Sequence, residues 1–437
     1  MNIILLSGGS GKRLWPLSND VRSRQFLKLF KRQDGSYESM IQRVCRQIRM
    51  ADDQAMITVA TSKAQVSAVH NQLEDTVNVC IEPNRKGTFP VVALTAAYLR
   101  DRKGLAEEEI VVVCPIDPYV EDRYFSELQK LEELVRAGAN IALLGIRPTE
   151  ASDKYGYIIP ENGEPVSAVR TFKEKPDLQT AGEYLGSGAL WNGGVFACRL
   201  GYILEQAHQE IAFTDFEDLY DQYEKLDEIS FDYAVVEKEP NIRVLRYDGL
   251  WKDLSTWDVL SEEMMEPVIG QALYNDSCEN LNIINELNVP ILCMGLKNVV
   301  VSASAEGILV SDKKESQDIE PFVNSLNQQV MFAEKSWGNF CVLDVEDGSL
   351  TVKVTLNPGY RMNYHSHDHR DEIWTVISGR GKTIVDGMEE QVKPGDVITM
   401  EAGCKHTIVA ETAMQIIEVQ LGKEINVHDK HKYELED

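Results

Sequence analysis

The first 265 or so residues alternate short apolar segments with longer segments of mixed polarity, and this alternation constrains the fold more than any other feature. The apolar segments are typical of buried β-strands, and the mixed segments have helical spacing. Strand–helix alternation predicts an α/β fold with a mostly parallel sheet covered by helices, in which ligands bind beyond the carboxyl ends of the strands. The predicted strands are 3–6, 55–60, 77–81, 110–114 and 141–146, and the predicted helices are 39–49, 89–101 and 124–138.

Two regions with a different pattern of apolar and turn residues follow. Residues 266–330 contain short segments at 289–296, 298–303 and 307–311 between turn residues, which predicts a small β-rich connector. From residue 331 onward, glycine-containing turns recur at roughly eight-to-twelve-residue spacing with no helix between them, which predicts a small β-barrel or jelly roll. We therefore expect three domains, over 1–265, 266–330 and 331–437.

The charge of the chain limits its partners. With 70 acidic and 44 basic residues the formal net charge is −26, which argues against nucleic acid or an anionic membrane as the main partner. No apolar run approaches the length of a membrane span, and the opening segment lacks the basic region of a signal peptide. We therefore expect a cytoplasmic protein.

A glycine-rich turn directly follows the first predicted strand, with the sequence Ser-Gly-Gly-Ser-Gly-Lys-Arg over residues 7–13. Glycine removes the side chains that would keep phosphate oxygens away from backbone N–H groups. A P-loop would need glycine in place of Leu6 and Ser or Thr in place of Arg13. A dinucleotide-binding turn would need glycine in place of Leu14, so neither of these two patterns fits.

A third loop type matches over a longer run. Residues 8–18, Gly-Gly-Ser-Gly-Lys-Arg-Leu-Trp-Pro-Leu-Ser, closely resemble the signature of sugar-phosphate nucleotidyltransferases. The resemblance is greatest to the mannose-1-phosphate guanylyltransferase branch, including its long form with a C-terminal cupin-like domain. It implies a Rossmann-like nucleotidyltransferase domain, GTP and mannose 1-phosphate as substrates, and Mg²⁺ as cofactor. The residues themselves leave open another base and another hexose or heptose 1-phosphate.

The implied reaction is an in-line attack on the α-phosphorus that releases pyrophosphate, so positioning and charge neutralisation carry the rate. The resemblance gives Arg13 the neutralisation of the leaving pyrophosphate. Arg24 stands where the family usually has lysine, with Lys28 as an alternative cation. Asp117, after an apolar strand, and Asp253 resemble the metal-binding aspartates, and two carboxylates are enough for Mg²⁺. Taken alone, Asp117 is equally consistent with a helix N-cap.

Further segments match the family in order along the chain. The acid Glu174 is implied for sugar hydroxyls, the cation Lys175 for the sugar phosphate, and Asn192 for the hexose. The implied nucleotide-binding residues are Leu6, Gly8, Gly9, Ser10, Gly11, Lys12, Glu82, Arg85 and Thr88. The implied sugar-phosphate-binding residues are Tyr155, Gly156, Glu174, Lys175 and Asn192.

Six of the eight histidines lie from residue 365 onward. His365 and His367 fall on one face of a strand, because side chains alternate with period two. Glu372 joins that face only if the strand bends near residues 368–371, and His406 is spaced to come from a neighbouring strand. Two His, one Glu and a third His can hold Zn²⁺ or another divalent transition metal. His369 is an alternative ligand, and exposed, metal-free histidines are the other interpretation.

The pattern Gly359-x5-His-x-His-x4-Glu-x6-Gly379 resembles the first cupin motif, and the related barrel of two-domain relatives is a phosphomannose isomerase. His365 stands where those enzymes commonly have glutamine, and Ile373 replaces a histidine. The barrel is therefore expected either to isomerise mannose 6-phosphate or to serve dimerisation or regulation. We expect a homodimer. A non-catalytic nucleotide-sugar-binding protein is the remaining alternative.

Overall fold

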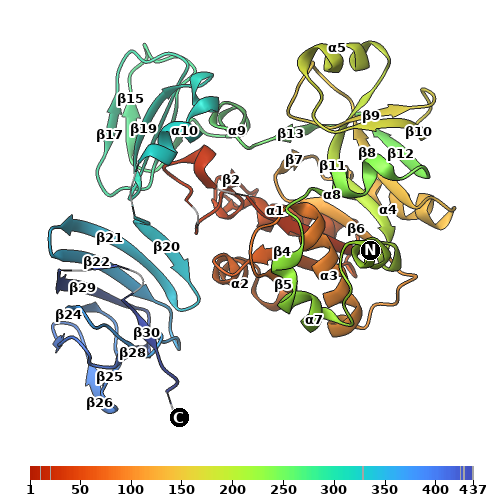
Figure 1. The fold of residues 1–437 in the computed structure, drawn as a ribbon. Coiled ribbons are helices and arrows are strands. Elements are labelled where there is room, and N and C mark those ends of the chain that lie inside the picture. The colour runs from red at the N-terminus through yellow and green to blue at the C-terminus, as the bar shows by residue number, and fades with distance from the viewer. Residues whose placement is uncertain (10, 20, 327–328, 424, 427–428, 436–437) are drawn as a thin grey trace. The chain divides into compact units, whose positions relative to one another are not determined.

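The structure is a computed structural model that describes residues 1–9, 11–19, 21–326, 329–423, 425–426 and 429–435. The chain divides into two compact units (Figure 1). The first unit contains residues 1–9 and 25–260, and the second contains residues 10–24 and 261–437. The glycine-rich run is thus divided between the units after Gly9.

A nine-stranded mixed sheet forms the centre of the first unit, in the order β5-β4-β1-β6-β11-β8-β12-β10-β9. Strands β5, β4, β1 and β6 are parallel, as are β8 and β12, whereas β11 runs antiparallel between β6 and β8. The expected parallel arrangement therefore holds for the strands of the first 115 residues, and the later strands make the sheet mixed. The strands are β1 (Asn2–Ser7), β4 (Met56–Ser62), β5 (Asn78–Glu82), β6 (Ile110–Pro115), β8 (Ile141–Ile146), β9 (Tyr157–Pro160), β10 (Val166–Lys173), β11 (Leu190–Arg199) and β12 (Ile242–Tyr247).

Helices cover both faces of this sheet. Val111, Val112 and Val113 of β6 are all fully buried, so neither face at that strand meets solvent. Helices α3 and α6 contact each other, and α4 contacts β6, β8 and β11. The helices are α1 (Met40–Ala51), α2 (Val66–Leu73), α3 (Thr88–Lys103), α4 (Arg123–Arg136), α5 (Leu178–Gly186), α6 (Leu200–Glu210), α7 (Phe216–Asp221) and α8 (Phe231–Ala234), with α9 (Trp257–Glu263) across the boundary between the units.

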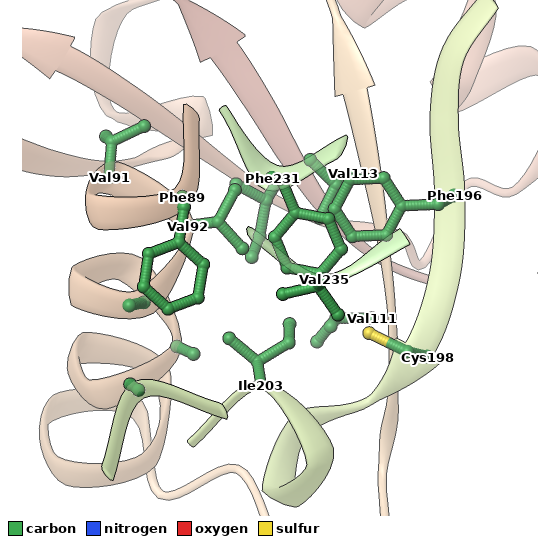
Figure 2. Close-up of a cluster of buried hydrophobic side chains, with 14 of the residues drawn as sticks. Phe89, Val91, Val92, Val111, Val113, Phe196, Cys198, Ile203, Phe231 and Val235 are labelled. Carbon is green, nitrogen blue, oxygen red and sulfur yellow. The ribbon is translucent and has the colours of Figure 1, made fainter. Parts of the chain in front are cut away.

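The core on one face of the sheet joins strand residues to three helices. Figure 2 shows Val111 and Val113 of β6 in the same cluster of buried side chains as Phe89 and Val92 of α3. Phe196 of β11 stacks on Phe231 of α8, with ring centroids 4.1 Å apart and planes inclined by 10°. This burial holds the segment around α8 against the sheet, next to the residues discussed below.

Residues 261–326 form small sheets in the second unit. Strands β14, β16 and β18 are parallel neighbours, β19 pairs antiparallel with β18, and β15 pairs parallel with β17. A small core of Leu281, Ile283, Cys293 and Val301 fills the space between them. The elements are β14 (Val268–Ile269), β15 (Ala272–Tyr274), β16 (Asn282–Asn285), β17 (Ile291–Cys293), β18 (Val299–Ser304), β19 (Gly307–Asp312), the 3₁₀ turn η6 (Glu315–Asp318) and α10 (Glu320–Ser325).

The C-terminal part is a two-sheet β-barrel. One sheet has the order β20-β21-β22-β29-β24-β27, the other has the order β26-β25-β28-β23-β30, and an apolar core that includes Trp374 and Ile416 lies in this part. The hairpin β25–β26 turns at Asp386 (φ 50°) and Gly387 (φ 81°), the two positive φ values of a type I′ turn. The strands are β20 (Phe332–Lys335), β21 (Gly338–Glu346), β22 (Ser349–Leu356), β23 (His365–Ser366), β24 (Arg370–Ser378), β25 (Gly381–Val385), β26 (Met388–Val392), β27 (Val397–Met400), β28 (His406–Ala410), β29 (Met414–Gly422) and β30 (His431–Lys432).

These elements confirm the predicted fold class. All five predicted strands and all three predicted helices of the α/β region are present, with ends shifted by one or two residues. The β-rich segments after residue 266 and the C-terminal barrel, whose described residues contain no helix, are also present. Within the described ranges, no helix is both long and apolar enough to span a membrane.

Candidate functional site

Several predicted residues lie at one edge of the first unit's sheet. Gly8 follows β1, Glu82 ends β5, and Asp117 comes two residues after β6. Because β5, β4, β1 and β6 are parallel, their carboxyl ends share an edge. The fold therefore brings residues that are more than a hundred positions apart to the location where α/β proteins bind ligands.

The two predicted metal-binding aspartates lie on paired strands. The short strand β7 (Pro118–Val120) pairs antiparallel with β13 (Trp251–Asp253), and the register places Asp253 opposite Pro118. Asp117 is the residue before Pro118, and both aspartates are half-buried. Burial raises the pKa of the Tyr155 hydroxyl, and the charge of Asp253 raises it further. A pair of carboxylates, partly shielded from water and close along two paired strands, fits the preference of Mg²⁺ for oxygen ligands.

The glycine turn has open and tightly packed positions. A Cβ atom on Gly8 or on Gly9 (φ 121°) would meet no described heavy atom within 4 Å, so the backbone there is open to approach. A Cβ atom on Gly11 would lie 2.5 Å from the carbonyl oxygen of Asn19, so only glycine fits this position. Ser10 lies outside the described residues. Leu6 lies on β1, opposite Ala60 and Pro115.

The basic residues after the turn belong to the second unit. Lys12 and Arg13 lie on the 3₁₀ turn η1 (Gly11–Leu14), and Arg24 begins the 3₁₀ turn η2 (Arg24–Phe26). The Nε of Arg13 donates to Glu320 at 3.0 Å, and the Nζ of Lys12 donates to Asn324 at 2.7 Å. Both partners lie on α10, and the sequence did not predict either contact.

Asn19 and Arg22, which follow η1 in sequence, form hydrogen bonds with residues between 286 and 332. Arg22 donates two hydrogen bonds to Glu286, at 2.7 and 2.8 Å. Asn19 donates to Glu306 at 2.7 Å, and Glu306 also accepts from the backbone N–H groups of Met331 and Phe332. Asn19 and Arg22 are therefore hydrogen-bonded to the β-rich region that follows residue 265 in sequence.

Glu82 and Thr88, two of the predicted nucleotide-binding residues, each accept a hydrogen bond within the first unit. Glu82 is buried and accepts a hydrogen bond from the Tyr223 hydroxyl at 3.2 Å, and burial raises its pKa. The hydroxyl of Thr88, the first residue of α3, accepts from the backbone N–H of Phe231 at 2.8 Å. Arg85 is exposed, in the segment between β5 and α3.

The predicted sugar-binding residues form a compact cluster. The backbone N–H of Asn192 donates to the carbonyl oxygen of Gly156 at 2.7 Å, and its side chain donates to Asp232 at 2.8 Å. A Cβ atom on Gly156 would lie 2.4 Å from Glu174 Oε2 and 3.3 Å from Asn192 Cβ. Gly156 is therefore required by the close approach of two other site residues.

The cluster concentrates acidic groups away from water. Burial, and then the charge of Asp232, raise the pKa of Glu174 to about 7. Burial also raises the pKa of Asp232, against the hydrogen bond from Asn192. The ammonium group of Lys175 lies 3.6 Å from Glu174 and is more than half exposed. Buried acceptors beside a cation suit a ligand that has both hydroxyl groups and a phosphate.

Three aromatic rings line the same region. The ring of Tyr155 lies 4.7 Å from Trp191 and 5.6 Å from Trp251, centroid to centroid. Trp191 precedes Asn192 and Trp251 opens β13, so these rings connect the Asn192 cluster to the strand that carries Asp253.

Two acids of this cluster were missing from the predicted site. Asp232 bonds Asn192, and Glu237 accepts from the backbone N–H of Glu174 at 3.0 Å. Both lie in the segment 230–238, and the resemblance of its sequence Ser-Phe-Asp-Tyr-Ala-Val-Val-Glu-Lys to the nucleotidyltransferase family is the signal that could have identified them. The sequence pattern does not show that this segment folds back onto β10 and β11.

Four side chains of the barrel meet in its interior. His365 pairs with His406 across β23 and β28, and the chain bends between β23 and β24, so Glu372 faces the histidines. Glu372 lies 2.9 Å from His367 Nε2 and 3.2 Å from His406 Nε2, and the ligand atoms of all four residues lie within 4.8 Å of one another. All four side chains are buried.

The hydrogen bonds of the imidazoles set their tautomers. Nδ1 of His365 lies 2.6 Å from the carbonyl oxygen of Asn363, and Nδ1 of His406 lies 3.0 Å from that of Cys404. Nδ1 of His367 bonds the carbonyl oxygen of Asp429. Each Nδ1 therefore carries the proton, and each Nε2 lone pair faces the cluster, which is the arrangement that metal-binding histidines use.

The electrostatics agree with a neutral His365 beside an ionised carboxylate. Burial, and then the charge of Lys430, lower the pKa of His365 to about 2. Burial opposes ionisation of Glu372, but the neighbouring imidazoles of His367 and His406 hold its pKa well below the usual value. His369, the alternative ligand, is instead largely exposed and bonds Asp429 at 3.1 Å, outside the cluster.

The fold and the site geometry define a class: an α/β protein with a glycine turn and a pair of acids at the carboxyl edge of its sheet, and with a cupin-type barrel in the same chain. The model of the nucleotidyl transferase family matches residues 2–267, and the chain belongs to this family. The cupin domain model matches residues 352–420.

The chain is similar over nearly its full length to curated relatives. It is 27% identical to the mannose-1-phosphate guanylyltransferase RfbM of Salmonella typhimurium, with 98% of this chain and 95% of the relative covered. It is 26% identical to the mannose-1-phosphate guanylyltransferase of Escherichia coli K12, with 98% and 96% covered. A solved structure described as a mannose-1-phosphate geranyltransferase from Thermus thermophilus is similar with a TM-score of 0.62 and 26% identity, and it covers 75% of this chain and 99% of its own.

Proposed function

We propose that this protein transfers the guanylyl group of GTP to mannose 1-phosphate, forming GDP-mannose and pyrophosphate with Mg²⁺. The observation that carries the proposal is the pairing of β7 with β13, which brings Asp117 and Asp253 together beyond the carboxyl edge of the sheet. The glycine turn after β1 and the acidic cluster around Asn192 supply the phosphate-binding and sugar-binding features of such a reaction. The choice of guanine and mannose rests on the relatives.

Each group then has a defined part. Asp117 and Asp253 would hold the metal ion, which supplies charge neutralisation at the phosphates when bound. Asn192 and Glu174 orient the hexose, and Lys175 pairs with its phosphate so that a phosphate oxygen meets the α-phosphorus in line. Arg13 neutralises the charge that grows on the leaving pyrophosphate, and Arg24 is a second cation of this kind.

The test is a panel assay of pyrophosphate release that crosses the four NTPs with mannose, glucose and heptose 1-phosphates. We expect Mg²⁺-dependent release with GTP and mannose 1-phosphate above the other pairs. Asp117→Ala and Asp253→Ala should each reduce the rate about 10²–10³-fold, as loss of a preorganised electrostatic group does. Asp221→Ala, at an exposed acid outside the site, is the matched control. Binding of the nucleotide sugar without turnover would instead support a non-catalytic binding protein.

We also propose that the barrel binds one divalent transition metal, with Zn²⁺ the first candidate, through His365, His367, His406 and Glu372. Three inward Nε2 atoms and a carboxylate fit such an ion, and Nε2 of His406 is buried without an aligned hydrogen bond within the described part of the chain. Elemental analysis of the full chain should find about one metal ion that is lost in His365→Ala. A metal content equal in variant and wild type would count against the site.

An isomerase activity at this barrel is the second candidate function, and the buried His–Glu cluster is the observation that favours it. The metal-loaded full chain, supplied with mannose 6-phosphate, should then produce fructose 6-phosphate. Metal-loaded protein that leaves mannose 6-phosphate unchanged would leave the barrel with a structural or regulatory role.

Homodimerisation is also proposed. Leu273 and Leu292 lie opposite each other on the parallel strands β15 and β17, and their side chains are 70% and 69% exposed. Two large apolar side chains presented together are typical of an interface. Light scattering should give a dimer mass for the wild type, and Leu273→Glu should reduce it towards the monomer.

A further inference from the structure

The helix α10 carries two hydrogen-bond acceptors that face the basic residues of η1. Glu320 and Asn324 are four residues apart, so they lie on the same side of the helix. Glu320 accepts from Arg13 and Asn324 accepts from Lys12, and the two elements are in contact. Both pairs lie within the second unit, although their members are about 310 positions apart in sequence.

The atom that Arg13 uses is informative. Glu320 Oε2 bonds Nε, on the side of the guanidinium group, at 3.0 Å. Among the described residues, Nη1 and Nη2 of Arg13 donate no hydrogen bond. This end of the guanidinium is the edge that binds phosphate oxygens in a bidentate manner. The contact with Glu320 thus orients the group and leaves its phosphate-binding edge available.

The contact of Lys12 has the same character. Asn324 offers a neutral oxygen at 2.7 Å, so this contact brings no opposing charge and uses only one of the three N–H donors of the ammonium group. A carboxylate at this position would compete with phosphate for the ammonium ion, whereas an amide oxygen fixes its position with little competition.

We propose that Glu320 is a positioning residue for nucleotidyl transfer, which holds Arg13 through Nε so that its Nη edge is preorganised for the pyrophosphate part of the nucleotide. This inference rests on the proposed function, because that function gives Arg13 its role. Arg13 is half exposed, and a long exposed side chain loses much rotamer freedom when it binds a ligand. Orienting it beforehand reduces that loss, and an effect of about tenfold on kcat/KM is expected.

Glu320 adds little to folding, since an exposed ion pair contributes little to stability. Glu320→Ala should therefore lower kcat/KM for the nucleotide about tenfold, with the melting temperature and the KM for the sugar phosphate unchanged. Glu320→Gln keeps an oxygen that can accept from Nε and should recover most of the rate. Glu315→Ala removes an equal charge from an exposed position on the neighbouring turn η6 and should match the wild type.

The experiment combines a double-mutant cycle with a direct view of Arg13. In the Arg13→Ala background, Glu320→Ala should have no further effect. NMR spectra of the full chain labelled with ¹⁵N-arginine report on Arg13 directly, and its Nε–H signal is assigned as the one that is lost in Arg13→Lys. This signal should be sharp in wild type and in Glu320→Gln, and broadened in Glu320→Ala. An unchanged Nε–H signal, an equal effect of Glu315→Ala, or an effect of Glu320→Ala that persists without Arg13 would overturn the proposal.

The outcome separates this inference from the proposed function. If the wild type releases no pyrophosphate, the proposed function fails. Calorimetric titration of the full chain with magnesium pyrophosphate then decides the role of Glu320. Weaker binding in Glu320→Ala than in Glu320→Gln and Glu315→Ala supports the positioning role, and equal binding in all three variants refutes it.

Discussion

Replacing Gly156 with alanine tests the packing of the cluster that we propose binds the sugar. The added Cβ atom would lie 2.4 Å from Glu174 Oε2, 3.1 Å from Phe172 Cζ and 3.3 Å from Asn192 Cβ. Non-bonded heavy atoms prefer separations of about 3.5–4.0 Å, so the Glu174 carboxylate must retreat by about 1 Å. The carboxylate is the far end of a flexible side chain and can move, so the loss in the free energy of unfolding should stay within about 1–3 kcal/mol.

The effect on catalysis should be larger than the effect on folding. A misplacement of about 1 Å in a positioning group can cost about 10²-fold in rate. We therefore expect kcat/KM for the sugar 1-phosphate to fall about 10²-fold, with the KM for the nucleotide within about threefold of wild type.

Steady-state pyrophosphate release with each substrate varied in turn measures both quantities, and urea unfolding measures the stability. Gly163→Ala is the matched control, because its Cβ atom would meet no described heavy atom within 4 Å. Unchanged kcat/KM for the sugar phosphate in Gly156→Ala, or an equal loss in Gly163→Ala, would refute the assignment of this cluster to sugar binding.

Three further predictions follow from burial and charge. The pKa of Glu174 is raised on folding, so the stability that this carboxyl group contributes is complete below its unfolded pKa of about 4.5 and is lost as the pH rises through about 7. The free energy of unfolding of Glu174→Gln, measured by urea titration and compared with that of wild type, should therefore rise over that pH interval. Phe231→Ala should lower the free energy of unfolding by about 3–5 kcal/mol, because it removes a fully buried ring stacked on Phe196, and a loss below about 1 kcal/mol would contradict the packing shown in Figure 2. Chelation of the barrel metal should lower the melting temperature of the wild-type chain but not that of Glu372→Ala, because this variant lacks one of the four metal ligands. An equal change of melting temperature in both proteins would point to another metal site.

The sequence by itself determined the secondary structure and the class of the fold. Hydrophobic periodicity is a local property, so the strands near residues 3–6 and 110–114 were predictable from a few neighbouring residues. The turn Asp386-Gly387 is similarly local, since its conformation requires residues that tolerate positive φ. The prediction that Asp117 and Asp253 bind the metal came from motif resemblance. The pairing of β7 with β13 adds that Asp253 lies opposite Pro118, the residue after Asp117.

Only the tertiary structure decided which distant side chains meet. No spacing rule connects Arg13 with Glu320, Asn192 with Asp232, or Gly156 with Glu174, because these contacts depend on how whole elements pack. The tautomers of the barrel histidines were equally inaccessible, since each depends on a backbone carbonyl oxygen that the fold places beside Nδ1. Local chemistry thus specified the elements and the reactive residue types, whereas long-range packing specified which groups meet and how each is oriented.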